Sequence, residues 1–317
     1  MTLPRSSSPD APLPTGTILK AIASIMAGIL LLDMMAVFIR MLSDTYPATQ
    51  LSVLRNLFGL IPSVLVLVSL RDWHSRGRPL RVRQWPIIVI RGLSVTMAQL
   101  FFYLALARLE FATASTLAFA GPLFVTALSV PVLGERVGPW RWAAVLIGFG
   151  GVIMVMRPGS DAFTLAALLP VGAAAGYAIS SVLVRRIDTD VPTPLVNLYS
   201  TFVAMLGAGV LLTILESPVA FQSVEDVALI AAMGISGGTG VLFLIMAYRL
   251  VQPSIVAPFE YSGILISFAL GWIFFNEAPF GRLFPGALLI IGAGLLIVWR
   301  ERRMAGVRPP LARGRKQ

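Results

Sequence analysis

Residues 102–157 read FYLALARLEFATASTLAFAGPLFVTALSVPVLGERVGPWRWAAVLIGFGGVIMVMR, and residues 244–300 repeat the pattern as LIMAYRLVQPSIVAPFEYSGILISFALGWIFFNEAPFGRLFPGALLIIGAGLLIVWR. After a one-residue slip in the alignment, Glu135 falls on Glu277. Each copy predicts an apolar helix, an Arg-Leu corner, a second apolar helix, a short loop carrying Glu and a third apolar helix. Duplicated membrane segments are one way to build a transport protein, with the solute held between two halves.

The composition is that of a membrane protein. Of the 317 residues, 57% are apolar and only 13% are charged, with a mean hydropathy of +0.84. A soluble domain carries roughly 25% charged residues. The chain has no cysteine and one histidine, so thiolate or histidine-based sites are not expected, and no cofactor or metal is predicted. The basic residues lie in loops and in the tail, where membrane orientation explains them better than nucleic acid does.

Runs of about 20 apolar residues recur along the chain and predict ten membrane-spanning helices. Residues 1–17, rich in Ser and Pro, are predicted to be a disordered cytoplasmic N-terminus, and residues 301–317 a basic cytoplasmic tail. The predicted fold is an all-α integral membrane protein, with spans at residues 18–39, 47–70, 85–107, 110–133, 140–157, 163–184, 194–215, 226–249, 253–275 and 282–300.

The basic residues predict how these spans are oriented. With the N-terminus inside, the predicted cytoplasmic segments hold 19 basic residues and the outer segments hold 4, as the positive-inside rule requires. The connection at 71–84 carries five arginines, whereas its counterpart at 216–225 carries none. Two five-helix halves, residues 18–157 and 163–300, with opposite charge bias predict an inverted repeat. Both termini are then predicted to be cytoplasmic, and the predicted location is the plasma membrane, meaning the inner membrane of a bacterium.

Two segments resemble a known family. The stretch LAFAGPLFVTALSVPVLGERVGPWRWAAVLIGFGGVIMV, with Glu135, and its counterpart FEYSGILISFALGWIFFNEAPF, with Glu277, are similar to EamA-type members of the drug/metabolite transporter superfamily. The resemblance covers residues 18–300 and implies a ten-helix transporter of amino acids, nucleotide-like metabolites, vitamins or drugs. The stretches DMMAVFIRML and YPATQLSVLRN also look like riboflavin and S-adenosylmethionine carriers of this group.

Ionisable residues within the predicted spans are candidates for function: Asp33, Arg55, Arg91 and Glu260. Charges inside a membrane are costly and tend to face a cavity or a partner. Depth along the helices places Asp33 with Arg55 near the outer face, and Glu260 with Arg91 near the cytoplasmic face. Each acid is expected to lie within reach of its arginine in one conformational state of the protein. The pair would then serve as a gate latch, a substrate contact or a proton site. The alternative is a static ion pair that holds helices together.

A candidate solute lining consists of further polar and aromatic side chains within the spans: Gln99, Tyr103, Tyr177 and Tyr261. Such side chains could stack against and hydrogen-bond a planar or amphipathic solute. Taken singly, a tyrosine is more often a marker of the membrane interface.

Glycine and proline interrupt two equivalent spans, at Gly121 and Pro122 in the fourth and at Pro258 and Gly263 in the ninth. Broken or bent helices at corresponding places in two halves point towards a binding site, although close helix packing explains most glycines.

Two loop acids, Glu135 and Glu277, follow these same spans at the membrane edge. Their repetition predicts a shared structural role, capping or tethering the following helix, and marks them as a family signature rather than as catalytic groups.

These patterns predict a secondary transporter that moves a small organic metabolite by alternating access. Its partners would be the solute, the lipid bilayer and, if transport is coupled, protons. A channel or structural membrane subunit is the alternative. A membrane-embedded enzyme is disfavoured because the spans contain no Cys or His and their two acids lie at opposite depths. One complete inverted repeat can form a whole transport pathway, so a monomer is sufficient. A homodimer is not excluded.

Overall fold

A computed structural model describes residues 15–75, 77, 80, 82–134, 138–156, 164–188, 191–250, 259–277 and 280–305. Its regular secondary structure in these ranges is helical. In chain order the elements are α1 (Thr15–Leu42), α2 (Ala48–Ser69), α3 (Arg71–Ser75), α4 (Trp85–Arg108), α5 (Phe111–Ala118), α6 (Gly121–Leu133), α7 (Pro139–Met156), η1 (Leu165–Ala167), α8 (Leu168–Leu183), η2 (Val184–Arg186), α9 (Thr193–Leu215), α10 (Val224–Leu250), α12 (Ser262–Phe275), α13 (Phe280–Leu283) and α14 (Gly286–Ala305).

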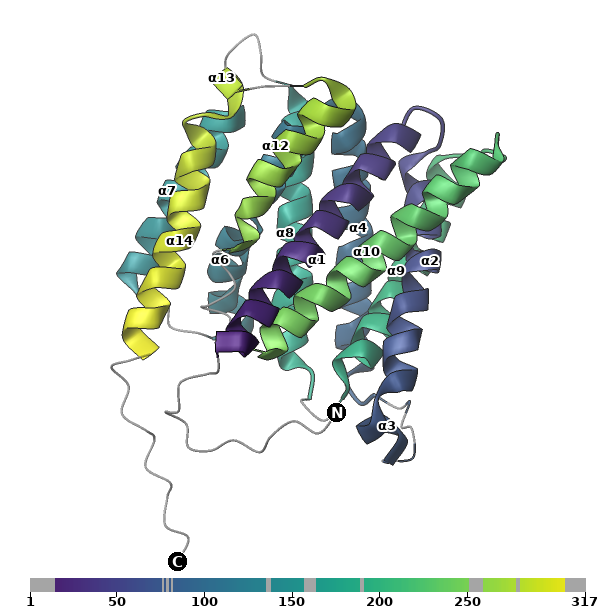
Figure 1. Ribbon diagram of the computed structural model, residues 1–317, viewed down its shortest axis with the longest axis horizontal. Coiled ribbons are helices and arrows are strands. Elements are labelled where there is room, and N and C mark those ends of the chain that lie inside the picture. The colour runs from purple at the N-terminus through teal and green to yellow at the C-terminus, as the bar shows by residue number, and fades with distance from the viewer. Residues whose placement is uncertain are drawn as a thin grey trace, which may run out of the picture.

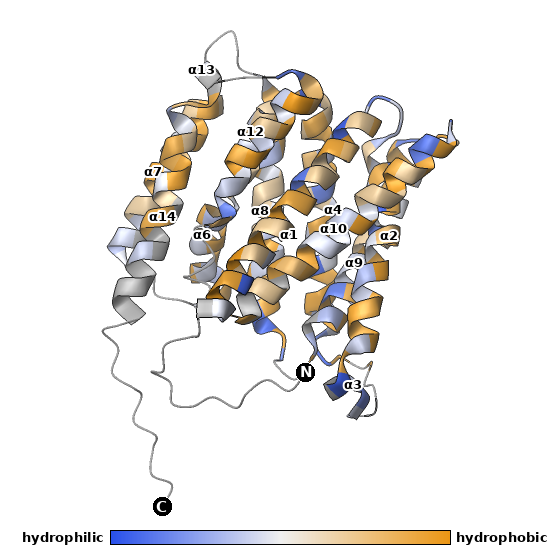
Figure 2. Ribbon diagram, viewed as in Figure 1, coloured by the Kyte–Doolittle hydropathy of each residue, from blue (hydrophilic) through white to orange (hydrophobic). Residues whose placement is uncertain are grey.

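The helices present an apolar surface to their surroundings. Seven described segments are long and apolar enough to cross a membrane, and shorter apolar helices cover Trp142–Met156 and Ser262–Phe275. Large apolar side chains point outward, as Leu146, Ile214 and Ile273 do at 68%, 70% and 69% exposure, and apolar residues run along the length of the bundle (Figure 2). Lipid tails suit such a surface far better than water. The protein is therefore an all-helical, multi-pass membrane protein.

Helices from the two halves of the chain interleave in the bundle. α1 lies beside α10 and α12, α4 packs against α8 and α9, and α7 pairs with α14 at one edge (Figure 1). α2 packs against both α9 and α10. α1 begins and α14 ends at the same end of the bundle (Figure 1).

Glycines permit the closest of these helix contacts. A Cβ atom at Gly238 of α10 would lie 2.8 Å from the carbonyl oxygen of Gly59 in α2. A Cβ atom at Gly151 of α7 would lie 2.7 Å from the carbonyl oxygen of Gly286 in α14. Neither position has room for a side chain, so the backbones themselves pack against each other there.

The predicted fourth span is broken near its middle. α5 ends at Ala118, and α6 begins at Gly121 with Pro122 in its first turn. Proline suits this place because the first N–H groups of a helix have no intrahelical partner. Gly263 of α12 faces the break, since a Cβ atom there would clash with the ring of Phe119. The break in one half therefore packs directly against a glycine in the other.

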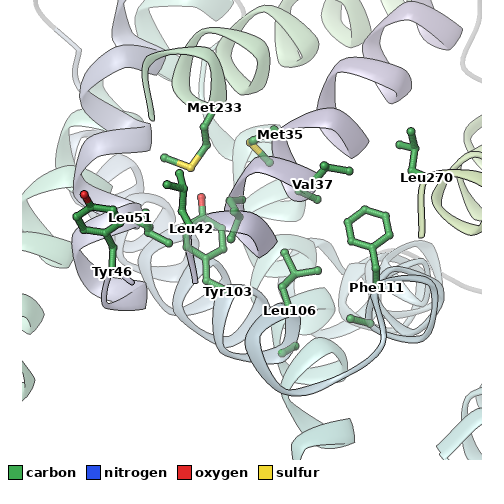
Figure 3. Packing of buried hydrophobic residues seen from close by; sticks show 14 of the residues in the cluster. Met35, Val37, Leu42, Tyr46, Leu51, Tyr103, Leu106, Phe111, Met233 and Leu270 are labelled. Atoms are coloured by element: carbon green, nitrogen blue, oxygen red, sulfur yellow. The ribbon is translucent and has the colours of Figure 1, made fainter. Parts of the chain in front are cut away.

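The largest hydrophobic cluster fills one end of the bundle. It combines the end of α1, the start of α2, the end of α4, the starts of α5 and α10 and the end of α12, with Met35, Val37, Leu42, Tyr46, Leu51, Tyr103, Leu106, Phe111, Met233 and Leu270 among its members (Figure 3). Tyr46, Leu51 and Phe111 are each at most 2% exposed. We call this end, which also holds the connections at 43–47 and 216–223, the sealed end.

Candidate functional site

A cavity of about 400 Å³ lies between α1, α2, α4, α5, α8 and α10. Asp33, Arg55 and Tyr177, three of the residues predicted from sequence, line it together. Ligand pockets measure about 300–1,000 Å³, so this cavity suits a small solute. Its other described lining residues are Leu32, Met35, Ala36, Phe102, Ser115, Ala118, Phe119, Ser181, Val241 and Leu244.

The cavity extends away from the sealed end. Met35 and Ala36 on its wall belong to the hydrophobic cluster that fills that end. In the other direction the lining reaches Ser181, an exposed residue two positions before the end of α8, and Leu244, six positions before the end of α10. The cavity is therefore covered on the side of the sealed end and continues towards the opposite end.

Asp33 enters the cavity from α1 and is 8% exposed. Its Oδ1 accepts a hydrogen bond from Ser267 Oγ of α12 at 3.1 Å. Its Oδ2 is buried without a hydrogen-bond partner. A buried carboxylate oxygen that has lost its hydration and gained no donor is costly. Oδ2 is therefore positioned to receive a donor group of a solute, or a proton.

Arg55 enters the same cavity from α2. Its Nε lies 3.4 Å from Met35 Sδ, and its Nη1 donates to Asn56 Oδ1 at 3.1 Å. Helix α10 leaves space for the guanidinium group, because a Cβ atom at Gly237 would lie 3.1 Å from both Nε and Nη2. Within the described residues Nη2 has no hydrogen bond and Arg55 forms no ion pair with Asp33. The two opposite charges share one cavity and remain apart.

A buried amide network holds Arg55 in place. Gln99 Oε1 of α4 accepts hydrogen bonds from Asn56 Nδ2 at 2.8 Å and from Ser52 Oγ at 2.7 Å, and Gln99 Nε2 donates to Asn56 Oδ1 at 3.1 Å. Gln99 is predicted to line the solute path, but it is not among the described cavity-lining residues and instead joins α4 to α2. The sequence did not single out Ser52 or Asn56. Each is an uncharged polar residue in an apolar span and belongs to no repeated motif, so nothing in the sequence distinguishes it.

The other predicted residues lie outside the described cavity lining. Tyr103 is 1% exposed within the sealed-end cluster, and its hydroxyl group has no hydrogen-bond partner. Arg91 of α4 has Nε and Nη1 buried without hydrogen-bond partners, and Glu260 lies two residues before the start of α12. The pairing of these two residues stays a prediction. Tyr261 packs in a second apolar cluster, beside Leu117 and Ile264.

Glu277 joins several helices at the sealed end. Its Oε1 lies 3.5 Å from Arg40 Nη2, and its Oε2 accepts a hydrogen bond from the backbone N–H of Phe111 at 2.6 Å. Arg40 also donates to the carbonyl oxygen of Leu106. The sequence predicted a tether to the following helix, whereas Glu277 binds the end of α1 and the start of α5. Glu135, the predicted counterpart of Glu277, and Pro258, the predicted helix bend of the ninth span, lie outside the described residues.

Further contacts tie together the two connections of the sealed end. Tyr46 donates to Asp226 Oδ2 at 2.6 Å and accepts from the backbone N–H of Gln222 at 3.0 Å. Gln50 exchanges two hydrogen bonds with the backbone of Val219, both 2.8 Å long. These bonds fasten the α1–α2 connection and the start of α2 to the α9–α10 connection.

Comparison with known proteins identifies the family. Residues 16–157 and 164–299 both match the model of the EamA-like transporter family. The chain belongs to this EamA-like family. Membership confirms the resemblance to the drug/metabolite transporter superfamily, and it makes the protein a membrane transporter and not an enzyme, as the sequence predicted.

Named relatives of this EamA transporter include both importers and exporters. It is 27% identical over 247 residues to an S-adenosylmethionine uptake transporter of Rickettsia prowazekii, covering 78% of this chain and 82% of the relative. It is 27% identical over 282 residues to a pseudopaline exporter of Pseudomonas aeruginosa, covering 89% and 95%. A riboflavin transporter of Rhizobium johnstonii is 32% identical over 191 residues, and this match spans 60% of this chain and 62% of the relative.

The fold of this EamA transporter also has a counterpart among solved structures. A crystal structure matches it with a TM-score of 0.62 and 23% sequence identity, covering 90% of this chain and 98% of the other. At this identity the match shows a shared fold.

Proposed function

We propose that this protein is a secondary transporter that moves a small organic metabolite by alternating access. The observation that carries the proposal is the cavity holding Asp33 and Arg55, covered at one end of the bundle and continuing towards the other. Its relatives are named for riboflavin, S-adenosylmethionine and pseudopaline, which supports a small organic solute. A channel would need a path open at both ends, and the sealed end argues against one.

The proposed architecture is ten spans in two inverted five-helix halves, with residues 18–157 in the first and 163–300 in the second. The two family matches divide the chain at nearly the same place. Helix packing supports a two-fold relation, because α1 packs on α10 as its counterpart α8 packs on α4. Three further contacts join direct counterparts: α2 with α9, α5 with α12 and α7 with α14. A two-fold axis that relates the two halves would produce this pattern of contacts.

The proposed orientation places the sealed end outside the cell and both termini in the cytoplasm of a bacterium. Acidic residues lie in the connection at 216–223 and in the first turn of α10. The opposite end carries basic residues, including Arg71, Arg185 and Arg186. The positive-inside rule assigns the basic end to the cytoplasm, so in the proposed orientation the cavity faces the cytoplasm.

Asp33, Arg55 and Tyr177 are the proposed solute contacts. Asp33 Oδ2 is also the proposed place for a coupling proton, because it is buried and has no donor. Glu260 and Arg91 are proposed to act on the pathway in a different state of the transporter.

Alternating access requires the sealed end to open, and we propose that Arg40 and Glu277 form its latch. An inverted repeat places an equivalent latch at the cytoplasmic end. There, Arg186 at the end of η2 donates to the carbonyl oxygen of Val132 near the end of α6, and Glu135 follows two residues after α6. The proposed cytoplasmic latch joins Arg186 with Glu135 when the outer latch has parted.

Counterflow in proteoliposomes tests the transport function. Vesicles are preloaded with fractionated cell metabolites, and labelled members of the active fraction are supplied outside. A carrier produces transient accumulation above that in empty vesicles. Asp33→Asn should abolish it, whereas Glu225→Gln, which neutralises an exposed acid outside the cavity, should not. Equilibration without accumulation would indicate a channel, and equal activity of Asp33→Asn would remove Asp33 from the mechanism.

A further inference from the structure

We infer that the transported solute is a small zwitterion built on a flat aromatic or heteroaromatic body, with its cationic group at Asp33 and its anionic group at Arg55. This inference deepens the proposed transport function and rests on it. The observations that carry it are the unpartnered oxygen of Asp33, the fixed guanidinium of Arg55 and three aromatic rings around one small cavity.

The charge of the cavity sets the charge of its occupant. Asp33 and Arg55 both line the cavity, and their formal charges cancel. Each has an atom left without a described hydrogen-bond partner, Oδ2 of Asp33 and Nη2 of Arg55. A net cation would satisfy Asp33 and meet Arg55 as a like charge, and a net anion would do the reverse. A solute with both charges satisfies both groups, and charge-assisted hydrogen bonds are the strongest of their kind.

The remaining wall sets the shape of the occupant. Phe102 of α4, Phe119 between α5 and α6, and Tyr177 of α8 all line the cavity. Aromatic side chains favour stacked or edge-on contacts with another ring. Ser115 Oγ, which is buried without a partner, adds one polar contact to a wall that is otherwise largely apolar. The volume of about 400 Å³ is near the lower limit for ligand pockets, so one small ring system fits.

Four probes separate charge from shape. Tryptophan is a zwitterion, tryptamine a cation and indole-3-propionate an anion, all with the same ring, and alanine is a zwitterion without it. Binding of each labelled probe to the purified full chain is measured at equilibrium. Tryptophan should bind at least about tenfold more tightly than the other three. A tighter cation or anion, or alanine equal to tryptophan, would overturn the inference.

Two variants test which group reads which charge. Asp33→Asn should reverse the preference from tryptophan to indole-3-propionate, and Arg55→Gln should reverse it to tryptamine. Glu225→Gln and Arg71→Gln, at exposed sites, should keep the original order. Unchanged order in both cavity variants would contradict the assignment. The ranking on the unmodified chain stands as a test even if a variant fails to fold.

The two proposals fail in distinguishable ways. Counterflow with cell metabolites, combined with no binding of any of the four probes, would overturn the solute class and leave the carrier intact. Tryptophan binding in the predicted order without counterflow of any solute would support the site and overturn transport.

Discussion

Arg40 at the end of α1 and Glu277 beyond the end of α12 meet at the sealed end, with Nη2 and Oε1 3.5 Å apart. The same carboxylate accepts the backbone N–H of Phe111, and the same guanidinium group lies 5.9 Å from the ring of Phe275. Both side chains are partly buried, at 24% and 17% exposure. The pair joins helices of both halves at the end of the bundle that the proposed alternating access would open.

Weakening this pair should expose the cavity from the outside. Glu277→Gln keeps an acceptor for the backbone N–H of Phe111 but removes the charge that attracts Arg40. The helices at the sealed end should therefore separate more often. The chain has no cysteine, so Ser115→Cys places the only thiol in the cavity wall. An impermeant maleimide added outside should label this thiol faster when Glu277→Gln is also present. Equal labelling with and without Glu277→Gln would show that the pair is not a latch.

The space beside Arg55 should be essential for transport. A Cβ atom at Gly237 would clash with Met35 and crowd the guanidinium of Arg55, so Gly237→Ala should lower counterflow severalfold. Gly209→Ala is the matched control, because a Cβ atom there meets nothing within 4 Å. That control should be neutral for transport and stabilise α9 by roughly 0.5–1 kcal/mol. Equal counterflow in both variants would contradict the role of Gly237.

The amide network should matter for both stability and transport. Gln99→Met keeps the side-chain length but leaves Asn56 and Ser52 without their shared acceptor, at a cost of about 1–3 kcal/mol per unsatisfied group. We expect a lower unfolding temperature in detergent and weaker counterflow, because Asn56 no longer holds Arg55. Gln222→Met, at an exposed position, is the control. Full activity of a destabilised Gln99→Met protein would restrict the network to a packing role.

Glu260 should act on the solute pathway in a conformational state other than the one that this structure describes. Glu260→Gln should insert normally but change the rate of transport or its dependence on pH, because neutralising the acid removes a site that can exchange protons. Counterflow across about pH 5 to 8 is compared with that of Glu225→Gln. A rate and pH profile identical to those of the unmodified chain would reduce Glu260 to a structural residue.

Periodicity and composition predicted the helical membrane fold well, because repeated apolar runs of about 20 residues are rare outside membrane-spanning helices. The break between α5 and α6 lies where Gly121 and Pro122 interrupt an apolar run. Charge also marks Asp33 and Arg55 in the sequence, since a charge in a span stands out against its apolar neighbours.

Partners across the bundle could not be predicted in the same way. In the sequence, Arg40 looks like an ordinary charged residue of a loop. Its contact with Glu277 depends on how helices that are far apart in the sequence pack together. Ser267, which donates to Asp33, is one neutral residue in an apolar helix. Gln99 has the polarity of a lining residue, but its rotation about α4 places it against α2 instead. Such assignments need the three-dimensional arrangement.

We propose that the cavity of Asp33 and Arg55 is the path of the solute. Ser181→Cys places a single thiol on the exposed part of its wall, and Ser69→Cys places one on an exposed position outside it. Both proteins are treated with a bulky maleimide from the cytoplasmic side and assayed for counterflow. We predict full labelling of both, with counterflow lost only in Ser181→Cys. Complete labelling of Ser181→Cys with counterflow unchanged would show that the solute does not pass through this cavity.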